Sequence, residues 1–279
     1  MIGPPMARPI ERVVVPLDAA SENRTAIDTA ARLAARTKAP LHGIFVEDED
    51  LLHLAQLPFA RQVTPGAGAV PFTPELAELH LRAAAERARQ DLLAAAKHHG
   101  VKCSFEIVRG TSETALSGAS QQDLIVAGAL SRPIAGHFRL ECRWWSSIEV
   151  ASGPFLLARH DWSRAGPVVV LLRDCNPASA RLLDAAAQVA EARDGLLTLV
   201  CPPAIVDTKE FENWLSDRLQ GRSVRLQIEV APTDFAALRQ RIGELDCRLL
   251  AVEAGLVEGR ADRARELVER FACDVLIVG

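Results

Sequence analysis

The sequence predicts an α/β protein built from two five-stranded parallel-sheet units in tandem. The main observation is a pair of short β-branched runs, residues 13–18 and 168–174, which each end in an aspartate and lead into an Ala-rich helical pattern. Both runs are continuously apolar rather than alternating, which is typical of strands buried on both faces. A similar alternation of strands and helices follows each run. Such alternation implies right-handed crossovers and a parallel sheet with helices on both faces.

The first predicted unit spans residues 1–162. One apolar face, formed by Ile27 and three alanines at helical spacing, indicates the first helix. Thr73 as N-cap, Pro74 at the first helical position and Gly100 as a stop signal define the longest helix. The predicted strands cover residues 12–17, 41–46, 101–108, 123–128 and 155–158, and the helices cover 21–36, 51–57, 73–99, 111–119 and 144–151.

Residues 47–73 form a long connection after the second strand of this unit. The stretch begins with four acidic residues, has a short helical segment containing Leu51 and Leu52, and is rich in Pro and Gly over residues 58–71. Connections of this length often serve as lids or docking elements, although a tolerated insertion is the alternative. The second unit has only the short connection 202–207, which suggests that the first unit is specialised and that Leu51 and Leu52 could dock a partner.

The second predicted unit spans residues 163–279, and Gly166-Pro167 marks the linker that opens it. In open α/β sheets the ligand site lies at the carboxyl ends of the strands. Candidate site residues should therefore follow residues 17, 46 and 126 and their second-unit counterparts. The predicted strands cover residues 168–172, 196–201, 224–230, 248–253 and 274–278, and the helices cover 178–193, 208–220, 232–244 and 260–271.

Composition excludes several classes of function. The net charge of −4 and the absence of tyrosine argue against a nucleic-acid partner. The apolar runs are too short for membrane insertion, and the N-terminus lacks the pattern of a signal peptide, so a cytoplasmic location is expected. The six cysteines form no C-x-x-C pair and are expected to be reduced structural thiols. The seven histidines show no metal-ligand spacing, so no metal site is expected.

The chain resembles the universal stress proteins in a tandem form, with two such domains in one polypeptide. In the first half the resemblance rests on residues 12–18, 41–46, 123–128 and 153–157. In the second half it is fainter and rests on residues 168–174, 249–252 and 274–279. It implies two flavodoxin-like, doubly wound domains that pair through their last strands as an internal pseudo-dimer.

Many members of that family bind ATP or AMP, and the resemblance implies where a nucleotide would lie. It would place the adenine at Asp18 and at the backbone near Val46. The phosphates would lie on a loop of pattern G-x2-G-x9-G-[ST] after the fourth strand, because glycines let the backbone approach phosphate and a hydroxyl donates to it. Gly128 fits the first glycine of that pattern, and Ser146 lies near the final hydroxyl.

The sequence departs from this phosphate-binding pattern in both halves. Ser131 stands where the second glycine is expected, and Trp145 precedes Ser146 in place of a third glycine. In the second half Glu253 occupies the first-glycine position, where its carboxylate would repel phosphate. Asp18 and Asp174 also have a simpler interpretation as turn or helix-capping residues.

The loop after the fourth strand carries residues that could compensate for the missing glycines. Four basic residues could hold an anion by charge instead of by backbone amides, or they could simply form a solvated loop. Trp144 and Trp145 could fill the vacated site, anchor a partner, or pack in the core between helix and sheet. The basic residues are Arg132, His137, Arg139 and Arg143.

These features together favour a non-catalytic cytoplasmic stress-response or regulatory protein with a degenerate nucleotide site and no bound cofactor. It would act on an unidentified protein partner, and two such chains could pair further as a homodimer. The alternative is a sensor that binds ATP or AMP in the first domain only. A weaker third class is an enzyme acting on a small anion, but no phosphate-loop motif and no Ser/His/Asp or Cys/His set at the strand ends supports catalysis.

Overall fold

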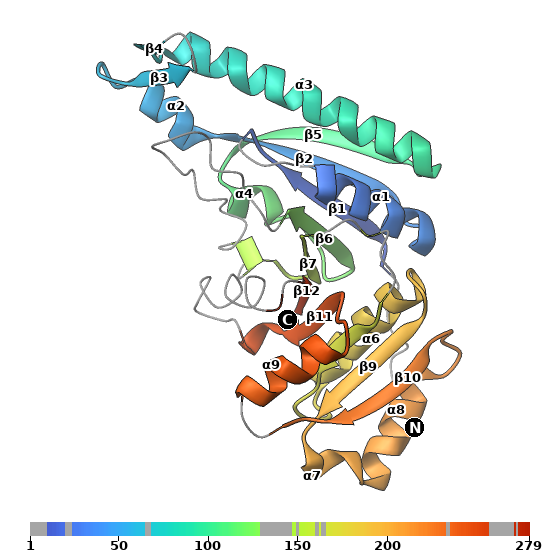
Figure 1. Ribbon diagram of the computed structural model, residues 1–279. Helices are drawn as coiled ribbons and strands as arrows, with labels where there is room; N and C mark the ends of the chain where they lie inside the picture. Colours follow the sequence, from blue (N-terminus) through green and yellow to red (C-terminus); the bar gives the residue numbers. More distant parts are fainter. Residues whose placement is uncertain are drawn as a thin grey trace.

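The computed structural model shows a mostly parallel sheet of ten strands with helices on both faces (Figure 1). It describes residues 10–19, 24–64, 68–128, 147–148, 151–159, 162, 166–232, 235–256, 271 and 273–279. The strand order is β10-β9-β8-β11-β12-β7-β6-β1-β2-β5, so the two edges are β10 and β5. The predicted α/β class is confirmed, and the described strands form one large, mostly parallel sheet.

Five strands come from the first part of the chain and pair in parallel. The central strand β1 lies between β2 and β6, which places its carboxyl end beside theirs. The bounds of β1, β6 and β7 match the prediction, whereas the edge strand β5 lies two residues further along the chain. The five strands are β1 (Arg12–Leu17), β2 (Leu41–Asp48), β5 (Cys103–Gly110), β6 (Asp123–Gly128) and β7 (Phe155–Ala158).

Five further strands come from the rest of the chain and follow the mirrored order β12-β11-β8-β9-β10. The two sets meet where β12 pairs antiparallel with β7, with Leu276 opposite Leu156. Every residue of these two strands is buried. The five strands are β8 (Val168–Leu171), β9 (Leu196–Cys201), β10 (Arg225–Val230), β11 (Leu249–Glu253) and β12 (Asp274–Val278).

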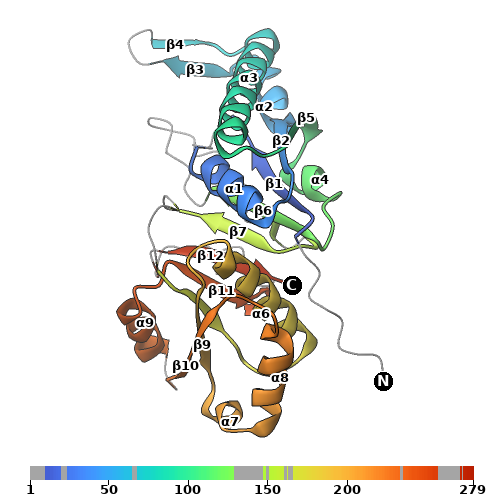
Figure 2. The ribbon, with the colours of Figure 1, turned by 90° about the vertical axis from the view of Figure 1, so that its right-hand side faces the viewer.

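The helices form a layer on each face of the sheet (Figures 1 and 2). One face is covered by α1 (Arg24–Thr37), α3 (Pro74–His99), α6 (Pro177–Glu191) and α8 (Lys209–Leu219), and the other by α4 (Ser112–Leu116) and α9 (Phe235–Glu244). The strand β1 shows why the apolar runs are continuous. Val13 and Val15 pack into the first layer, whereas Val14 packs into the second.

The predicted ends of the longest helix are confirmed. The Thr73 hydroxyl accepts a hydrogen bond from the Leu76 N–H at 3.4 Å, and Pro74 is the first helical residue. Gly100 ends the helix with a φ of 68°, a left-handed conformation that glycine adopts without a Cβ penalty. The face predicted from Ile27 is likewise buried along α1.

The connection 47–73 is more ordered than the sequence predicts. Its helix α2 (Glu49–Ala55) begins two residues earlier than expected because the Asp48 carboxylate caps it at the Asp50 N–H, 2.8 Å away. The stretch 58–71, expected to be irregular, contains an antiparallel hairpin of β3 (Arg61–Thr64) and β4 (Gly68–Pro71). That expectation was wrong because a hairpin tolerates proline at an outward position of an edge strand, where Pro71 lies.

The other differences concern connections and short helices. The short connection 202–207 contains the helical turn α7 (Pro203–Val206), and the 3-10 helix η1 (Ala254–Leu256) follows β11. Most of the helices predicted at 144–151 and 260–271 lies outside the described residues.

Gly153, just before β7, is the position where the least room is left for a side chain. A Cβ there would overlap the carbonyl oxygen of Asp123 and come within 2.6 Å of that of Ser120. Because these are backbone atoms, they cannot rotate away. We therefore predict that Gly153→Ala lowers the free energy of unfolding by about 1–3 kcal/mol in urea titrations. Gly118→Ala is the matched control, since a Cβ there meets no atom within 4 Å, and an equal loss in both variants would contradict the prediction.

Candidate functional site at the carboxyl ends of the strands

The first half of the sheet brings together three of the predicted site residues. Leu17 pairs with Phe45 in the register of β1 and β2, so Asp18 follows beside Val46. The strand β6 pairs in parallel with β1 as far as Val14 and Ile125, and it ends at Gly128 on the same side of the sheet. Val46 is buried, whereas Asp18 and Gly128 are half-buried. The topology therefore places these residues at the carboxyl-end edge of the sheet.

The other predicted site residues lie either in α2 or outside the described part of the chain. Leu51 and Leu52 lie in α2 and are half-buried. The loop residues of the predicted site lie outside the described part of the chain. These are Ser131, Arg132, Trp144, Trp145 and Ser146, together with His137, Arg139 and Arg143.

In the second half a hydrogen-bonded cluster lies at the carboxyl ends of β8 and β11. The buried hydroxyl of Ser179 lies 2.8 Å from Asp174 Oδ1 and 2.5 Å from Glu253 Oε1. Asn176 caps α6 by accepting hydrogen bonds from the N–H groups of Ala178 and Ser179. The N-terminus of α6 is therefore already occupied by side chains of this chain.

The electrostatics of this cluster oppose an anion. The backbone N–H of Asn176, helped by the Ser179 hydroxyl, lowers the pKa of Asp174 and so favours its charged form. A hydroxyl has a single proton, so Ser179 can donate fully to only one of the two carboxyl groups at a time. Glu253 is the last residue of β11, as Gly128 is of β6. A carboxylate thus stands where the first half has a glycine.

Asp174 and Glu253 are predicted in this region from the sequence, whereas Ser179 is not. The signal that could have identified it is the cap Asn176-Pro177, which fixes the first turn of α6 and places a hydroxyl two residues after the proline.

Ser179 is expected to stabilise this edge of the sheet. Ser179→Ala removes the one donor shared by Asp174 and Glu253, and should lower the free energy of unfolding by about 1–2 kcal/mol. Ser117→Ala is a matched control because its exposed hydroxyl donates only to the Thr114 carbonyl among the described contacts. The control should change the unfolding free energy by about 0.5 kcal/mol or less. Equal effects on the urea midpoint would contradict a special role for Ser179.

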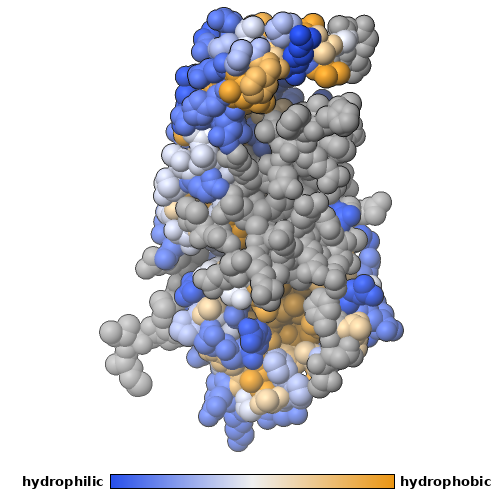
Figure 3. Space-filling view, turned by 90° about the vertical axis from the view of Figure 1, so that its left-hand side faces the viewer, coloured by the Kyte–Doolittle hydropathy of each residue, from blue (hydrophilic) through white to orange (hydrophobic). Residues whose placement is uncertain are grey.

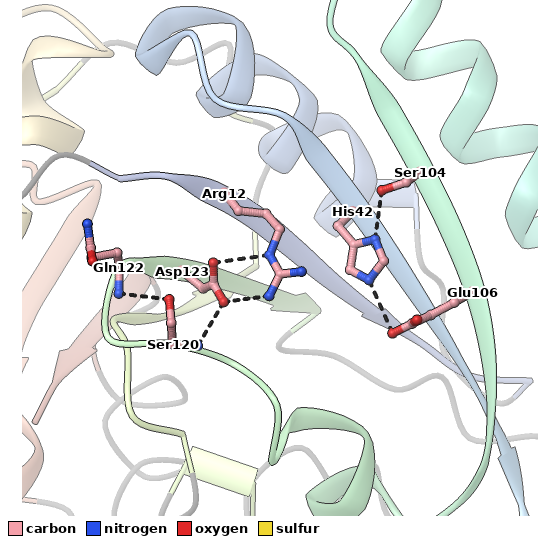
Figure 4. Close-up of polar contacts among 7 residues, drawn as sticks. All are labelled: Arg12, His42, Ser104, Glu106, Ser120, Gln122 and Asp123. Carbon is pink, nitrogen blue, oxygen red and sulfur yellow. Dashed lines mark hydrogen bonds and ion pairs between the residues drawn. The ribbon is translucent and has the colours of Figure 1, made fainter.

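A second polar cluster joins β2 to the edge strand β5 (Figure 4). His42 Nδ1 lies 2.8 Å from Ser104 Oγ, and His42 Nε2 lies 3.2 Å from Glu106 Oε1. The sequence does not reveal this set because His42 is more than 60 residues from the other two and single polar residues in a strand carry no spacing signal. Serine, histidine and glutamate are the types used in nucleophilic catalysis. These three, however, lie near the amino ends of their strands, away from Asp18.

The amino ends of β1 and β6 are joined by an ion pair (Figure 4). Arg12 donates from Nε and Nη2 to the two carboxylate oxygens of Asp123, at 3.1 and 2.7 Å. The Ser120 N–H donates to the same carboxylate at 2.8 Å. Burial by itself would raise the pKa of Asp123, but the hydrogen bonds from Arg12 and Ser120 and the charge of Arg12 together lower it.

This lowered pKa gives a pH-dependent prediction. Because the folded protein holds the pKa of Asp123 below the ordinary value of 3.8, the ionised carboxylate stabilises the fold above that value. The contribution is lost as the pH falls through the folded-state pKa. Asp123→Asn should therefore cost about 1–3 kcal/mol of unfolding free energy at pH 7. The difference from the unchanged protein should shrink in urea titrations below about pH 4.

The control for this prediction is Asp28→Asn. Asp28 pairs with Arg32 on α1, where 39% and 38% of the two side chains are exposed, and its other oxygen lies 3.4 Å from His99 Nε2. Such pairs contribute about 0–1 kcal/mol. Two results would contradict this role of the Asp123 carboxylate. One is a loss of unfolding free energy in Asp123→Asn that stays constant down to about pH 2, well below the ordinary carboxyl pKa. The other is a loss no larger than that of Asp28→Asn.

Among the residues that the structure describes, no group of three His, Cys, Asp or Glu side chains could hold a metal ion. The helices within the described ranges are all too short or too polar to cross a membrane.

Comparison with known proteins establishes the fold. No family model and no curated protein sequence matches the chain. Among solved structures, a universal stress protein from Archaeoglobus fulgidus superposes with a TM-score of 0.63 at 14% identity, covering 95% of each chain. A protein of unknown function from Pseudomonas aeruginosa PAO1 gives 0.58 at 15% identity, covering 97% of this chain and 93% of its own. The chain thus has the fold of solved universal stress proteins over nearly its whole length.

Proposed function

We propose that this chain is a cytoplasmic stress-response or regulatory protein that acts by binding another protein rather than by catalysis. In this proposal residues 1–162 and 163–279 are two universal-stress-protein-like domains paired as an internal pseudo-dimer. The observation that carries the proposal is the cluster of Asp174, Ser179 and Glu253. Glu253 stands where the resemblance would place the first phosphate-binding glycine of the second domain, and Ser179 holds it beside Asp174, the counterpart of Asp18.

The position of the Ser–His–Glu set supports a non-catalytic role. Ligands of open α/β sheets bind outside the carboxyl ends of the strands. His42 is the second residue of β2, and Ser104 and Glu106 are the second and fourth residues of β5. Their hydrogen bonds instead hold the edge strand against its only described neighbour in the sheet.

Protein interaction is supported by the insertion of the first half. Large hydrophobic side chains are exposed along residues 54–70, including Phe59 at 74% and Val63 at 71%. Exposed apolar groups gathered in one region commonly mark interaction sites. Leu51 and Leu52 are half-buried in α2, just before this region in the sequence. We retain them, with Trp144 and Trp145, as candidates for partner docking.

The second candidate function is a sensor that binds ATP or AMP in the first domain only. It is favoured by the register that brings Asp18, Val46 and Gly128 together at one edge of the sheet. In that case Ser131, Arg132 and Ser146 would complete the site, and the second domain would be a structural partner.

Isothermal titration calorimetry with Mg-ATP and with AMP separates the two candidates. A protein with a degenerate site should give no binding heat up to about 1 mM nucleotide, the weak end of specific affinities. Asp18→Asn and its second-half counterpart Asp174→Asn form the matched pair of variants. Micromolar binding that is lost in Asp18→Asn and kept in Asp174→Asn would overturn the degenerate site and establish the sensor.

A further inference from the structure

The hairpin of the insertion stands apart from the main sheet. The strands β3 and β4 form a two-stranded sheet of their own beside α2 and the beginning of α3 (Figure 1). Between β9 and β10 the second half has α7 and α8 instead. An isolated two-stranded hairpin is at best marginally stable in water, and it is stabilised by a third strand or by packing against a helix.

The hairpin and its surroundings expose apolar side chains. Figure 3 shows hydrophobic residues gathered at the top of the molecule, the end that carries α2 and the hairpin. In the register of the hairpin Val63 lies opposite Ala69, and Arg61 lies opposite Pro71. These four residues share one face, and all four are exposed. The large side chains exposed within this segment are Leu54, Leu57, Phe59, Val63 and Val70.

The backbone pairing shows which edge of the hairpin is open. The Phe72 N–H donates to the Ala60 carbonyl at 2.9 Å, which makes residues 60 and 72 a hydrogen-bonded pair. In an antiparallel ladder such pairs alternate with non-bonded pairs, so the backbone groups of Arg61 and Val63 point away from β4. No described residue pairs with those groups.

The two edges of the hairpin differ in their capacity to pair. On β4 the outward positions are Ala69 and Pro71, and proline has no N–H to donate. Proline on an edge is a common device against strand addition. The outer edge of β3 has no proline, so it can accept an added strand.

The charges near the hairpin favour a partner segment that carries basic residues. Six carboxylates and two arginines lie in the stretch from Glu47 to Arg82, and two of these carboxylates are in ion pairs, Glu47 with Arg109 and Glu78 with Arg82. Glu49, Asp50 and Glu75 are exposed. An added strand with basic residues beside its apolar positions would complement this acidic rim.

We propose that the outer edge of β3 binds an extended segment of a partner protein, whose alternate residues are apolar and whose ends carry Lys or Arg. The segment would pair with the backbone of Arg61 and Val63, and its apolar side chains would cover Val63 and its neighbours. This inference rests on the proposed function as an interaction protein and names the chemistry of the partner.

The test uses the full chain and a fluorescein-labelled peptide, Lys-Lys-Val-Thr-Val-Thr-Val-Lys-Lys, in fluorescence anisotropy titrations. Val63→Pro removes an outward N–H of β3 without removing a bond inside the hairpin. Ala69→Pro makes the same change at the opposite position on β4. We expect saturable binding that is at least tenfold weaker in Val63→Pro and changed by less than twofold in Ala69→Pro. A peptide with Glu in place of Lys should bind at least fivefold more weakly.

A second pair of variants covers the case in which proline unfolds the hairpin, which circular dichroism would reveal. Val63→Glu should weaken binding at least fivefold. Val230→Glu, at an exposed valine of the edge strand β10, should leave it unchanged. Equal effects in the members of either pair, or no binding at all, would overturn the proposal.

Sedimentation velocity tests whether two copies of the chain pair through β3 instead. A dimer that is present in the unchanged protein and lost in Val63→Pro would overturn the proposal of a separate partner protein. Nucleotide binding is measured separately, so micromolar ATP affinity would refute the degenerate site while the peptide result stood.

Discussion

The antiparallel pairing of β7 with β12 is the constraint on which the rest of the molecule depends. Both strands are buried along their whole length, so neither could face water as an edge without exposing a full row of apolar side chains. Pairing them joins two sets of five strands into one sheet. The core then becomes continuous, because the layer that contains Val13 also contains Val170. The Asp274 side chain adds a polar contact at this junction by accepting from the Arg159 N–H at 2.8 Å.

Much of the fold can be predicted from the sequence because strands buried on both faces have unbroken runs of apolar residues. The bounds of β1, β6, β7, β9 and β12 follow directly from such runs and the turn residues beside them. The prediction is poorer at the periphery. The edge strand β5 is half-exposed and lacks that signal, and the hairpin β3–β4 contains one large aliphatic residue in each strand. Its existence depends on the pairing of two weak strands rather than on either alone.

The candidate site was only partly predictable, for a related reason. Topology places the carboxyl ends of adjacent parallel strands together, so the proximity of Asp18, Val46 and Gly128 follows once the strand order is known. The contact of Ser179 with Glu253 joins positions 74 residues apart. It depends on the direction of a side chain in the first turn of α6. Residue spacing along the chain carries no information of that kind, and the same is true of His42 and Ser104, which are 62 residues apart.

The junction also has a consequence for how the chain is made. The partners in β7 and β12 are more than 100 residues apart, and β12 is the last strand of the sequence. During synthesis β7 therefore emerges from the ribosome long before the strand that covers it. Domains generally fold from the N-terminal side as they are made. The nascent first half must consequently spend several seconds with a bare apolar edge, at typical rates of about 5–20 residues per second. This exposure ends once β12 has been made and pairs with β7.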